Sequence, residues 1–232
     1  NLSIISFFCD FSVQDSIREC ADKIKNDLKA IDLLINNAGV VNTEYSETID
    51  GIENTFAVNH LGYFLFTNLL LDLVKKESES RIINVSSAAH HFVKGMQWDD
   101  INYKDDFKMG LKAYGQSKLG NILFTKQLAK KLQKDGVTVN AIHPGGVNTS
   151  LGNQNNSLLG RVMKIILKPF FRSPLKGANT IIYLAEIDGL SITGAYWVDG
   201  RVAKTSHYSK NEAEAEKLWR LSEKLVNQEF DI

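Results

Sequence analysis

The stretch Lys112-Ala113-Tyr114-Gly115-Gln116-Ser117-Lys118-Leu119-Gly120-Asn121 opens a long run in which apolar residues recur at helical spacing. The pattern predicts a helix, and residues four apart on a helix lie on one face. Tyr114 and Lys118 can therefore point into the same pocket. A free tyrosine has a pKa of about 10, and an ammonium one turn away favours the phenolate and lowers that pKa. The pair is a candidate general acid/base.

Tyr-x-x-x-Lys by itself is also typical of a half-buried tyrosine beside a solvated lysine. Four further motifs give it weight, and they follow in the chain as Asn36-Asn37-Ala38-Gly39, Asn59-His60-Leu61-Gly62, Val85-Ser86-Ser87 and Pro144-Gly145. With these motifs the chain resembles the short-chain dehydrogenase/reductase family over nearly its whole length. The stretches that begin at Asn84 and Leu119 resemble the retinol dehydrogenase branch of that family.

Apolar runs typical of buried strands alternate with helical patterns along the chain. We expect strands at residues 2–8, 31–35, 81–85, 137–142 and 195–198, with helices opening after most of them; Ser12 with Asp15 is a plausible cap for the first helix, which ends near Leu28. Such alternation predicts an α/β fold with a doubly wound parallel sheet of the Rossmann type. At 232 residues, a single domain over 1–232 is the default.

Members of this family begin with a strand, a turn of the type Thr-Gly-x-x-x-Gly-x-Gly and a helix. That turn holds the pyrophosphate of the cofactor at a helix N-terminus. No such turn precedes Asn36 in this sequence. The resemblance therefore implies that the N-terminal strand–helix unit is missing and that the Rossmann domain is N-terminally incomplete. We expect the sequence to be a fragment of a longer enzyme.

The resemblance implies a catalytic set of four residues. Tyr114 would donate or accept the hydroxyl proton, and Lys118 would lower the pKa of Tyr114 and bind the cofactor ribose. Ser87 would polarise the substrate carbonyl. Asn59 would hold a water that relays protons towards Lys118. From the residues alone, Ser86 is an alternative to Ser87, both serines could cap a turn, and Asn59 could be an ordinary polar residue in a helix.

The resemblance also implies which residues bind the cofactor, expected to be NADP with NAD as the alternative. They are Asp10, Phe11, Asn37, Ala38, Gly39, Tyr114, Lys118, Pro144, Gly145, Val147 and Thr149. Some of these residues also have a purely structural interpretation. Asn and Gly are common turn formers, and Asp10 could be a strand-end carboxylate that caps the next helix.

Other features limit the classes of partner. The formal net charge is zero, so no bulk attraction to nucleic acid is expected. His90, His91 and His143 lack acidic or thiol ligands at a suitable spacing, so no metal site is predicted.

The longest apolar run, Tyr63 to Val74, is too short to span a membrane. The segment from Leu158 to Phe171 is basic and amphipathic, which suits a segment that lies on a membrane surface. The resemblance implies a substrate lid there, and a helix packed on the core is an equal alternative. Two cysteines indicate buried thiols rather than a disulfide.

Together these observations predict an oxidoreductase that transfers a hydride between NAD(P) and a lipophilic carbonyl or alcohol, with retinal and retinol as the leading pair. By resemblance, the protein would be cytoplasmic or associated with a membrane of the endoplasmic-reticulum type. It would form a homodimer through the helices that carry Asn59 and Tyr114. The alternative is a non-catalytic, truncated protein that acts as an interaction module. A sugar-nucleotide epimerase or dehydratase also uses Tyr-x-x-x-Lys, but Asn-Asn-Ala-Gly and the short C-terminal region argue against it.

Overall fold

The computed structural model describes residues 3–77, 79–145 and 174–232. Within them, one sheet has the strand order β1-β2-β3-β4-β5. The strands are β1 (Leu33–Asn36), β2 (Arg81–Val85), β3 (Thr138–His143), β4 (Tyr196–Val198) and β5 (Arg201–Val202). The first four run parallel, and β5 pairs antiparallel with β4. Asn36 lies opposite Asn84, and Val85 lies opposite Ile142, so β1, β2 and β3 end at a common edge.

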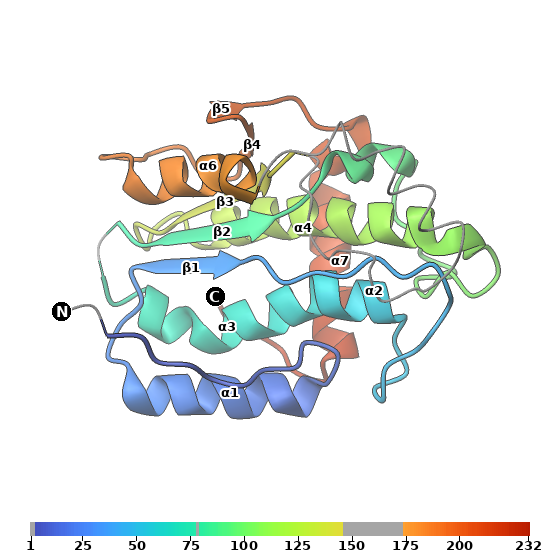
Figure 1. Ribbon diagram of the computed structural model, residues 1–232, viewed down its shortest axis with the longest axis horizontal. Helices are drawn as coiled ribbons and strands as arrows, with labels where there is room; N and C mark the ends of the chain where they lie inside the picture. Colours follow the sequence, from blue (N-terminus) through green and yellow to red (C-terminus); the bar gives the residue numbers. More distant parts are fainter. Residues whose placement is uncertain (1–2, 78, 146–173) are drawn as a thin grey trace.

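Helices cover both faces of this sheet, as expected for a doubly wound α/β fold (Figure 1). They are α1 (Gln14–Asp27), α2 (Asn54–Phe56), the π-helical turn η1 (Ala57–Leu61), α3 (Gly62–Val74), α4 (Leu111–Lys131), α6 (Pro174–Glu186) and α7 (Glu212–Leu225). Three short 3-10 segments are η2 (Ala88–Phe92), η3 (Lys108–Gly110) and η5 (His207–Lys210). The predicted strands at 81–85, 137–142 and 195–198 and the predicted Tyr114 helix are all present, with ends shifted by a few residues.

Apolar side chains along the strands point alternately to the two faces of the sheet, and each face has its own hydrophobic core. Leu34, Ile82 and Val139 face α1, α3, α4 and α7 in the larger core. Ile83, Val85 and Ile142 face α6, where they pack with Leu184 and Trp197. Successive residues of a strand point to opposite faces, so two apolar faces produce the near-continuous apolar runs seen in the sequence.

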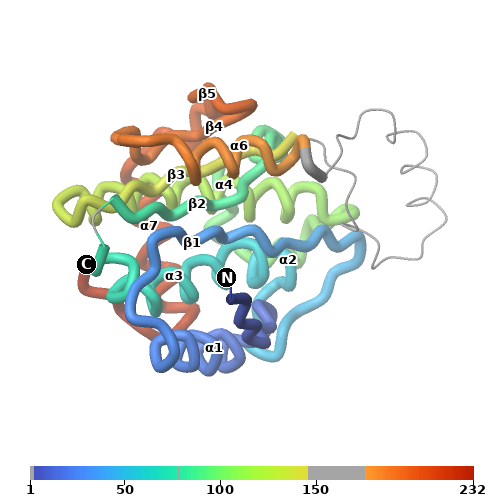
Figure 2. The backbone as a smooth tube through the Cα atoms, turned by 60° about the vertical axis from the view of Figure 1, so that its left-hand side comes forward, coloured from blue at the N-terminus to red at the C-terminus, as the bar shows by residue number. Residues whose placement is uncertain are grey.

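The prediction of a buried strand at 2–8 is wrong. Residues 3–8 form no strand, and Ile4 and Phe8 are 92% and 81% exposed. The segment lies beside α1 instead (Figure 2). Phe7, Cys9 and Phe11 pack there against the larger core. A strand needs a hydrogen-bonded neighbour, and β1 pairs only with β2 among the described residues. For the same reason β1 lies at the sheet edge, where Ile35 is 40% exposed.

The expected cap of the first helix is also wrong, although the helix itself is present. The residue before α1 is Val13, which makes no side-chain cap. The hydroxyl of Ser12 donates to Asp10 instead. The helix is held by its packing face, on which Ile17, Cys20, Ala21 and Ile24 recur at helical spacing and are buried.

The C-terminal helix α7 packs across the outer side of α3 and α4. It begins at Asn211, whose side-chain oxygen accepts from the backbone N–H groups of Ala213 and Glu214. Trp219, which is 1% exposed, meets the ring of Phe64 edge-on at 4.9 Å and lies over that of Phe124 at 5.9 Å. These contacts fix α3 and α4 relative to each other from outside the sheet.

The stretch Asn54–Val74, formed by α2, η1 and α3, is long and apolar enough to cross a membrane by length and composition. It is longer than the apolar run recognised in the sequence because the helix begins well before Tyr63. However, 83% of its most apolar window is buried inside the protein. A core helix satisfies the same criterion, and the packing of α3 under the sheet is that of a core helix.

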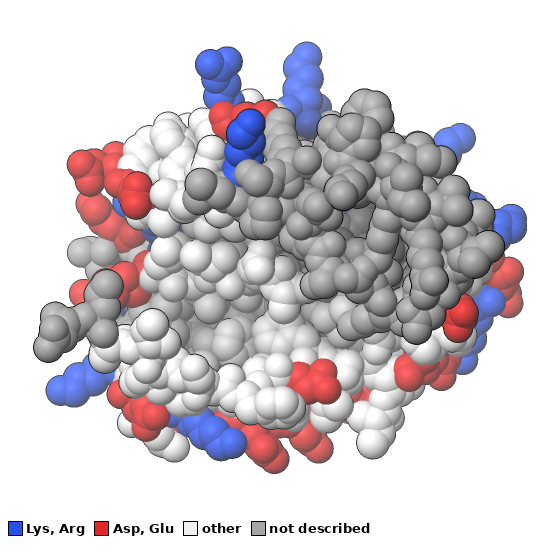
Figure 3. Space-filling model, viewed as in Figure 1, with Lys and Arg blue, Asp and Glu red and all other residues white. Residues whose placement is uncertain are grey.

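Charged side chains lie around the periphery of the face shown in Figure 3, and both signs are present. The visible described centre of that face is largely uncharged. This distribution agrees with the zero net charge of the sequence.

Candidate active site

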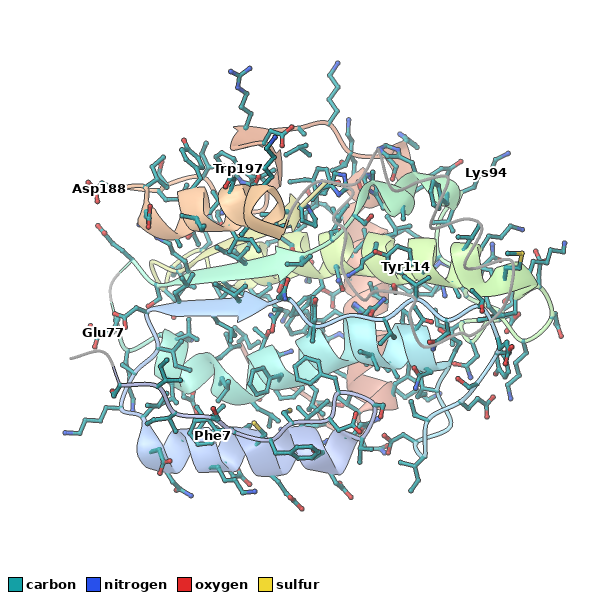
Figure 4. All side chains as sticks on the ribbon, in the orientation of Figure 1. Phe7, Glu77, Lys94, Tyr114, Asp188 and Trp197 are labelled. Carbon is teal, nitrogen blue, oxygen red and sulfur yellow. The ribbon has the colours of Figure 1, made fainter. Side chains whose placement is uncertain are left out.

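The candidate site lies where β1 and β2 end and α4 begins. Figure 4 shows Tyr114 on α4 beyond the carboxyl ends of these two strands. Asn37 to Gly39 follow β1, and Ser86 and Ser87 follow β2. In open α/β sheets, ligands bind at the carboxyl edge. The fold therefore brings three of the predicted motifs to the edge where a ligand is expected.

Ser87 and Tyr114 lie close enough for their hydroxyl groups to interact. Hydrogen bonding with Ser87 acts to lower the pKa of the Tyr114 phenol. Ser87 is held in extended conformation before η2, where its hydroxyl oxygen accepts from the backbone N–H of Ala89 at 3.1 Å. Two hydroxyls that can both donate to one substrate oxygen are thus placed side by side.

Ser86 has a different environment. Its hydroxyl donates to the backbone carbonyl of Lys118 at 2.7 Å, and the residue is 1% exposed. The hydroxyl is therefore used to join β2 to α4. Of the two serines that the sequence left open, Ser87 is the one that faces Tyr114.

Lys118 lies beneath Tyr114 and is 3% exposed. Its Nζ donates to the carbonyl of Val85 at 3.0 Å and lies 5.7 Å from the ring centre of Tyr114 and 5.8 Å from that of Tyr63. Burial lowers the pKa of Lys118 to about 7, because an ammonium loses its hydration in the interior. The lysine is thus poised to gain or lose a proton near neutral pH.

The pKa of Tyr114 differs from the sequence-based expectation. Burial raises it above its ordinary value, and the Ser87 hydrogen bond offsets this only in part. We expected Lys118 to lower it, but desolvation of the phenolate is the largest influence, and the lowering influence comes from Ser87 rather than from Lys118. A phenol with a raised pKa is protonated at neutral pH and can donate its proton, but it is a weaker acid than a free tyrosine.

Asn59 lies in the π-helical turn η1 and is completely buried. Its amide nitrogen donates to the carbonyl of Val40 at 2.9 Å and to the hydroxyl of Ser117 at 3.1 Å, and its oxygen accepts from the N–H of Val40 at 2.8 Å. Single π turns are frequent at functional sites. The side chain ties the loop after β1 to α4, so a water held by Asn59 would have to bind its main chain.

The loop after β1 approaches the site closely at Gly39. A Cβ on this residue would lie 3.2 Å from Oδ1 of Asn59 and 3.6 Å from Nζ of Lys118. The carbonyl of Ala38 accepts from the hydroxyl of Tyr63 at 2.7 Å. Asn37 and Ala38 are exposed. The loop is fixed from beneath by Tyr63 and Asn59, and its residues Asn37 and Ala38 remain accessible to a cofactor.

Asparagines inside the strands form a polar chain that the sequence reasoning missed. The amide of Asn36 donates to Thr67 on α3 at 2.8 Å and to Asn84 on β2 at 2.7 Å. The amide of Asn84 donates in turn to Thr125 on α4 at 2.9 Å. A satisfied buried network of this kind specifies a unique packing. The available signal was an asparagine in each of two otherwise apolar strands.

Asp10 and Phe11 are not brought to the Tyr114 group by these contacts. Asp10 accepts from the backbone N–H and the hydroxyl of Ser12. Phe11 packs against α3, where a Cβ on Gly62 would lie only 2.7 Å from its ring, and it meets Tyr63 edge-on. In this structure both residues hold the N-terminal segment against the helices.

The remaining predicted cofactor residues follow β3. Pro144 and Gly145 are partly exposed, and Gly145 has φ +81°, which a residue with a side chain adopts only with strain. Val147 and Thr149 lie outside the described residues, as does the segment from Leu158 to Phe171. Within residues 3–77, 79–145 and 174–232, no three His, Cys, Asp or Glu side chains are grouped as metal ligands.

Comparisons with known proteins agree with this architecture. A family model described as enoyl-(acyl carrier protein) reductase matches residues 3–200. Retinol dehydrogenase 14 of Mus musculus is 40% identical over 222 residues, which are 94% of this chain and 65% of that protein. Retinol dehydrogenase 13 of Homo sapiens is 42% identical over 226 residues, which are 95% of this chain and 68% of that protein. The chain thus spans about two thirds of the length of these relatives.

Two solved structures are also similar. A putative uncharacterized protein from Mycobacterium paratuberculosis has a TM-score of 0.74 at 30% identity, covering 97% of this chain and 76% of its own. An NADPH-bound carbonyl reductase from chicken fatty liver has a TM-score of 0.62 at 20% identity, covering 87% of this chain and 77% of its own. At that identity the second likeness concerns the fold alone.

Proposed function

Because this chain belongs to the short-chain dehydrogenase/reductase family, we propose that it is the catalytic part of an oxidoreductase that interconverts a lipophilic carbonyl compound and its alcohol. The observation that carries the proposal is the contact between Ser87 and Tyr114 above the buried Lys118. The relatives named retinol dehydrogenase support retinal and retinol as the leading pair of substrates.

In this proposal Tyr114 donates a proton to the carbonyl oxygen during reduction. Its raised pKa keeps it protonated at neutral pH, and Ser87 donates a second hydrogen bond to the same oxygen as negative charge develops. Lys118 can replace the proton that Tyr114 has lost, because its own pKa is about 7. Oxidation of the alcohol is the reverse of these steps.

A nicotinamide dinucleotide bound at this edge would supply or accept the hydride. Asn37, Ala38 and Gly39 would hold it, because the end of β1 presents exposed backbone fixed by Asn59 and Tyr63. Gly145 would border it on the β3 side. We propose NADP as the cofactor and NAD as the alternative.

Substitution of Tyr114 tests this assignment in the full-length protein. Tyr114→Phe keeps the ring and removes the proton, so the NADPH-dependent reduction of retinal should fall by about 10²–10⁴-fold. Ser87→Ala should lower kcat with little change in the KM for NADPH. Tyr208→Phe makes the same chemical change at an exposed position on η5 and should leave turnover unchanged. Turnover of Tyr114→Phe within tenfold of the wild type would contradict the role.

The alternative is a non-catalytic protein that acts as an interaction module. Titration of the full-length protein with NADPH and with NADH separates the two proposals. Saturable binding supports the enzyme and also reveals the preferred cofactor. The lack of saturable binding of either dinucleotide would favour the interaction module.

A further inference from the structure

His90 is completely buried next to the candidate site, and the proposed chemistry does not use it. It lies in η2, three residues after Ser87. Its Nδ1 is 2.6 Å from the carbonyl oxygen of Ser87, and its Nε2 is 3.2 Å from the backbone nitrogen of Ser206. The imidazole therefore joins the end of β2 to the segment that follows β5.

The two partners fix the form of the imidazole. The backbone nitrogen of Ser206 can only donate, so Nε2 must be the acceptor and carry no proton. The carbonyl of Ser87 can only accept, so Nδ1 must carry the proton. Burial lowers the pKa of His90 to about 4, and the nearby His91 and His143 also act in that direction. The neutral, Nδ1-protonated ring is thus the form at neutral pH.

Two aromatic rings also pack against the imidazole of His90. The ring of Tyr196 meets it edge-on, with 5.1 Å between centres, and that of His91 lies 4.0 Å away. The buried N–H of Ser206 would lose its acceptor if the ring moved, which costs about 1–3 kcal/mol. His90 therefore has one orientation, and it transmits that orientation to Ser87.

The carbonyl of Ser87 receives two donors from this single residue. The backbone N–H of His90 lies 3.2 Å from it, and Nδ1 lies at 2.6 Å. Together with the bond from Ala89 to the Ser87 hydroxyl, they fix both ends of Ser87. We propose that His90 is a positioning residue that holds the Ser87 hydroxyl against Tyr114. This inference rests on the proposed function, in which that hydroxyl contacts the substrate oxygen.

Three variants of the full-length protein separate the two contacts of His90. His90→Asn keeps an N–H donor near the Nδ1 position and removes the acceptor for Ser206. His90→Gln places its amide near Nε2 and removes the donor to Ser87, and His90→Phe removes both. We expect His90→Asn to retain kcat within about threefold. His90→Gln and His90→Phe should lose about 10- to 100-fold in kcat, as a misplaced catalytic group does, with the KM for NADPH unchanged.

His207 is the matched control, because it is an exposed histidine on another short helix, η5. His207→Asn, His207→Gln and His207→Phe should all keep the kcat of the wild type. If His90 had only a structural role, the three His90 variants would lose stability, but the kcat per folded molecule would be the same in all of them. Urea denaturation of each variant supplies the folded fraction.

A readout that does not need turnover keeps this inference separate from the proposed function. The ¹³Cζ chemical shift of Tyr114 at pH 8 reports the hydrogen bonding of its phenol. This chemical shift should differ from that of the wild type in His90→Gln and His90→Phe and should be unchanged in His90→Asn. ¹⁵N spectra should show a neutral His90 protonated on Nδ1. A wild-type shift and wild-type kcat in His90→Gln, or protonation on Nε2, would overturn the positioning role even if the enzyme is active. An inactive wild type with the expected shifts would leave the positioning role intact and refute the function.

Discussion

The buried histidine of η1 should make the protein sensitive to acid. His60 is completely buried between the rings of Phe56 and Phe124, 5.0 Å and 6.3 Å away. Its Nε2 lies 3.0 Å from the hydroxyl of Ser222 on α7, and that hydroxyl already donates to the carbonyl of Leu218. Nε2 therefore carries a proton and donates it, which joins α7 to η1, and burial favours the neutral form of the ring.

The size of the effect follows from the pKa. Burial lowers the pKa of His60 from 6.5 to about 4, so the unfolded chain binds a proton at pH values where the folded protein does not. The stability from this group is complete above pH 6.5 and is lost as the pH falls towards 4. At pH 4.5 the loss is about 2.5 kcal/mol, a large part of an ordinary stability of 5–15 kcal/mol.

Urea denaturation of the full-length protein at pH 7.5 and pH 4.5 tests this prediction. His60→Gln keeps a donor for Ser222 but cannot titrate, so its loss of stability between the two pH values should be about 2.5 kcal/mol smaller than that of the wild type. Ser222→Ala is the control. It removes the hydrogen bond but not the burial, so it should lower stability at both pH values and keep the pH dependence. An equal pH dependence in wild type and His60→Gln would refute the reasoning.

Three further outcomes are expected. Lys118→Met should be more stable than the wild type at pH 7 and should lose that advantage as the pH rises towards 10.5. The reason is that the folded wild type holds the lysine proton only below about pH 7, whereas the unfolded chain holds it up to about pH 10.5. Urea denaturation at a series of pH values measures this difference. Trp219→Ala should cost about 3–5 kcal/mol by thermal or urea unfolding, since it empties the contact between α7, α3 and α4. Gly110→Ala should destabilise the start of α4 by more than about 1 kcal/mol in the same assay, because φ is +68° and the new Cβ would lie 2.0 Å from the carbonyl oxygen of Asn42.

Local patterns were sufficient to predict the elements that carry chemistry. Helical spacing placed Tyr114 and Lys118 on one helix, and a short apolar run placed Ser87 at the end of a strand. The apolar stretch from Leu2 to Phe8 has an equally good strand pattern, and its described part, residues 3–8, forms no strand. Its apolar residues satisfy the pattern, but hydrogen-bonded neighbours, which the pattern does not contain, decide whether a strand forms. The prediction at residues 31–35 succeeded because β2 supplies that neighbour.

The pKa values could not be predicted from spacing. A lysine four residues from a tyrosine suggests a lowered phenol pKa only if the lysine keeps its charge and the phenol stays hydrated. Both conditions fail here, because the sheet edge and α3 bury the two groups together. The roles of His60 and His90 were missed for a similar reason. Their partners, Ser222 and Ser206, lie more than 100 residues away in the chain.

The position of α7 also bears on the homodimer that the resemblance implied. That dimer would pair through the helices that carry Asn59 and Tyr114, which are η1 with α3 and α4. In this structure α7 already covers their outer side. Trp219 is packed on Phe64 and Phe124, and Ser222 is bonded to the buried His60. A second copy could reach the covered side only by displacing α7, which would expose Trp219 and leave His60 without its partner. Each of these losses costs kilocalories per mole. A dimer that used the part of these helices that Trp219 and Ser222 cover would therefore have to displace α7.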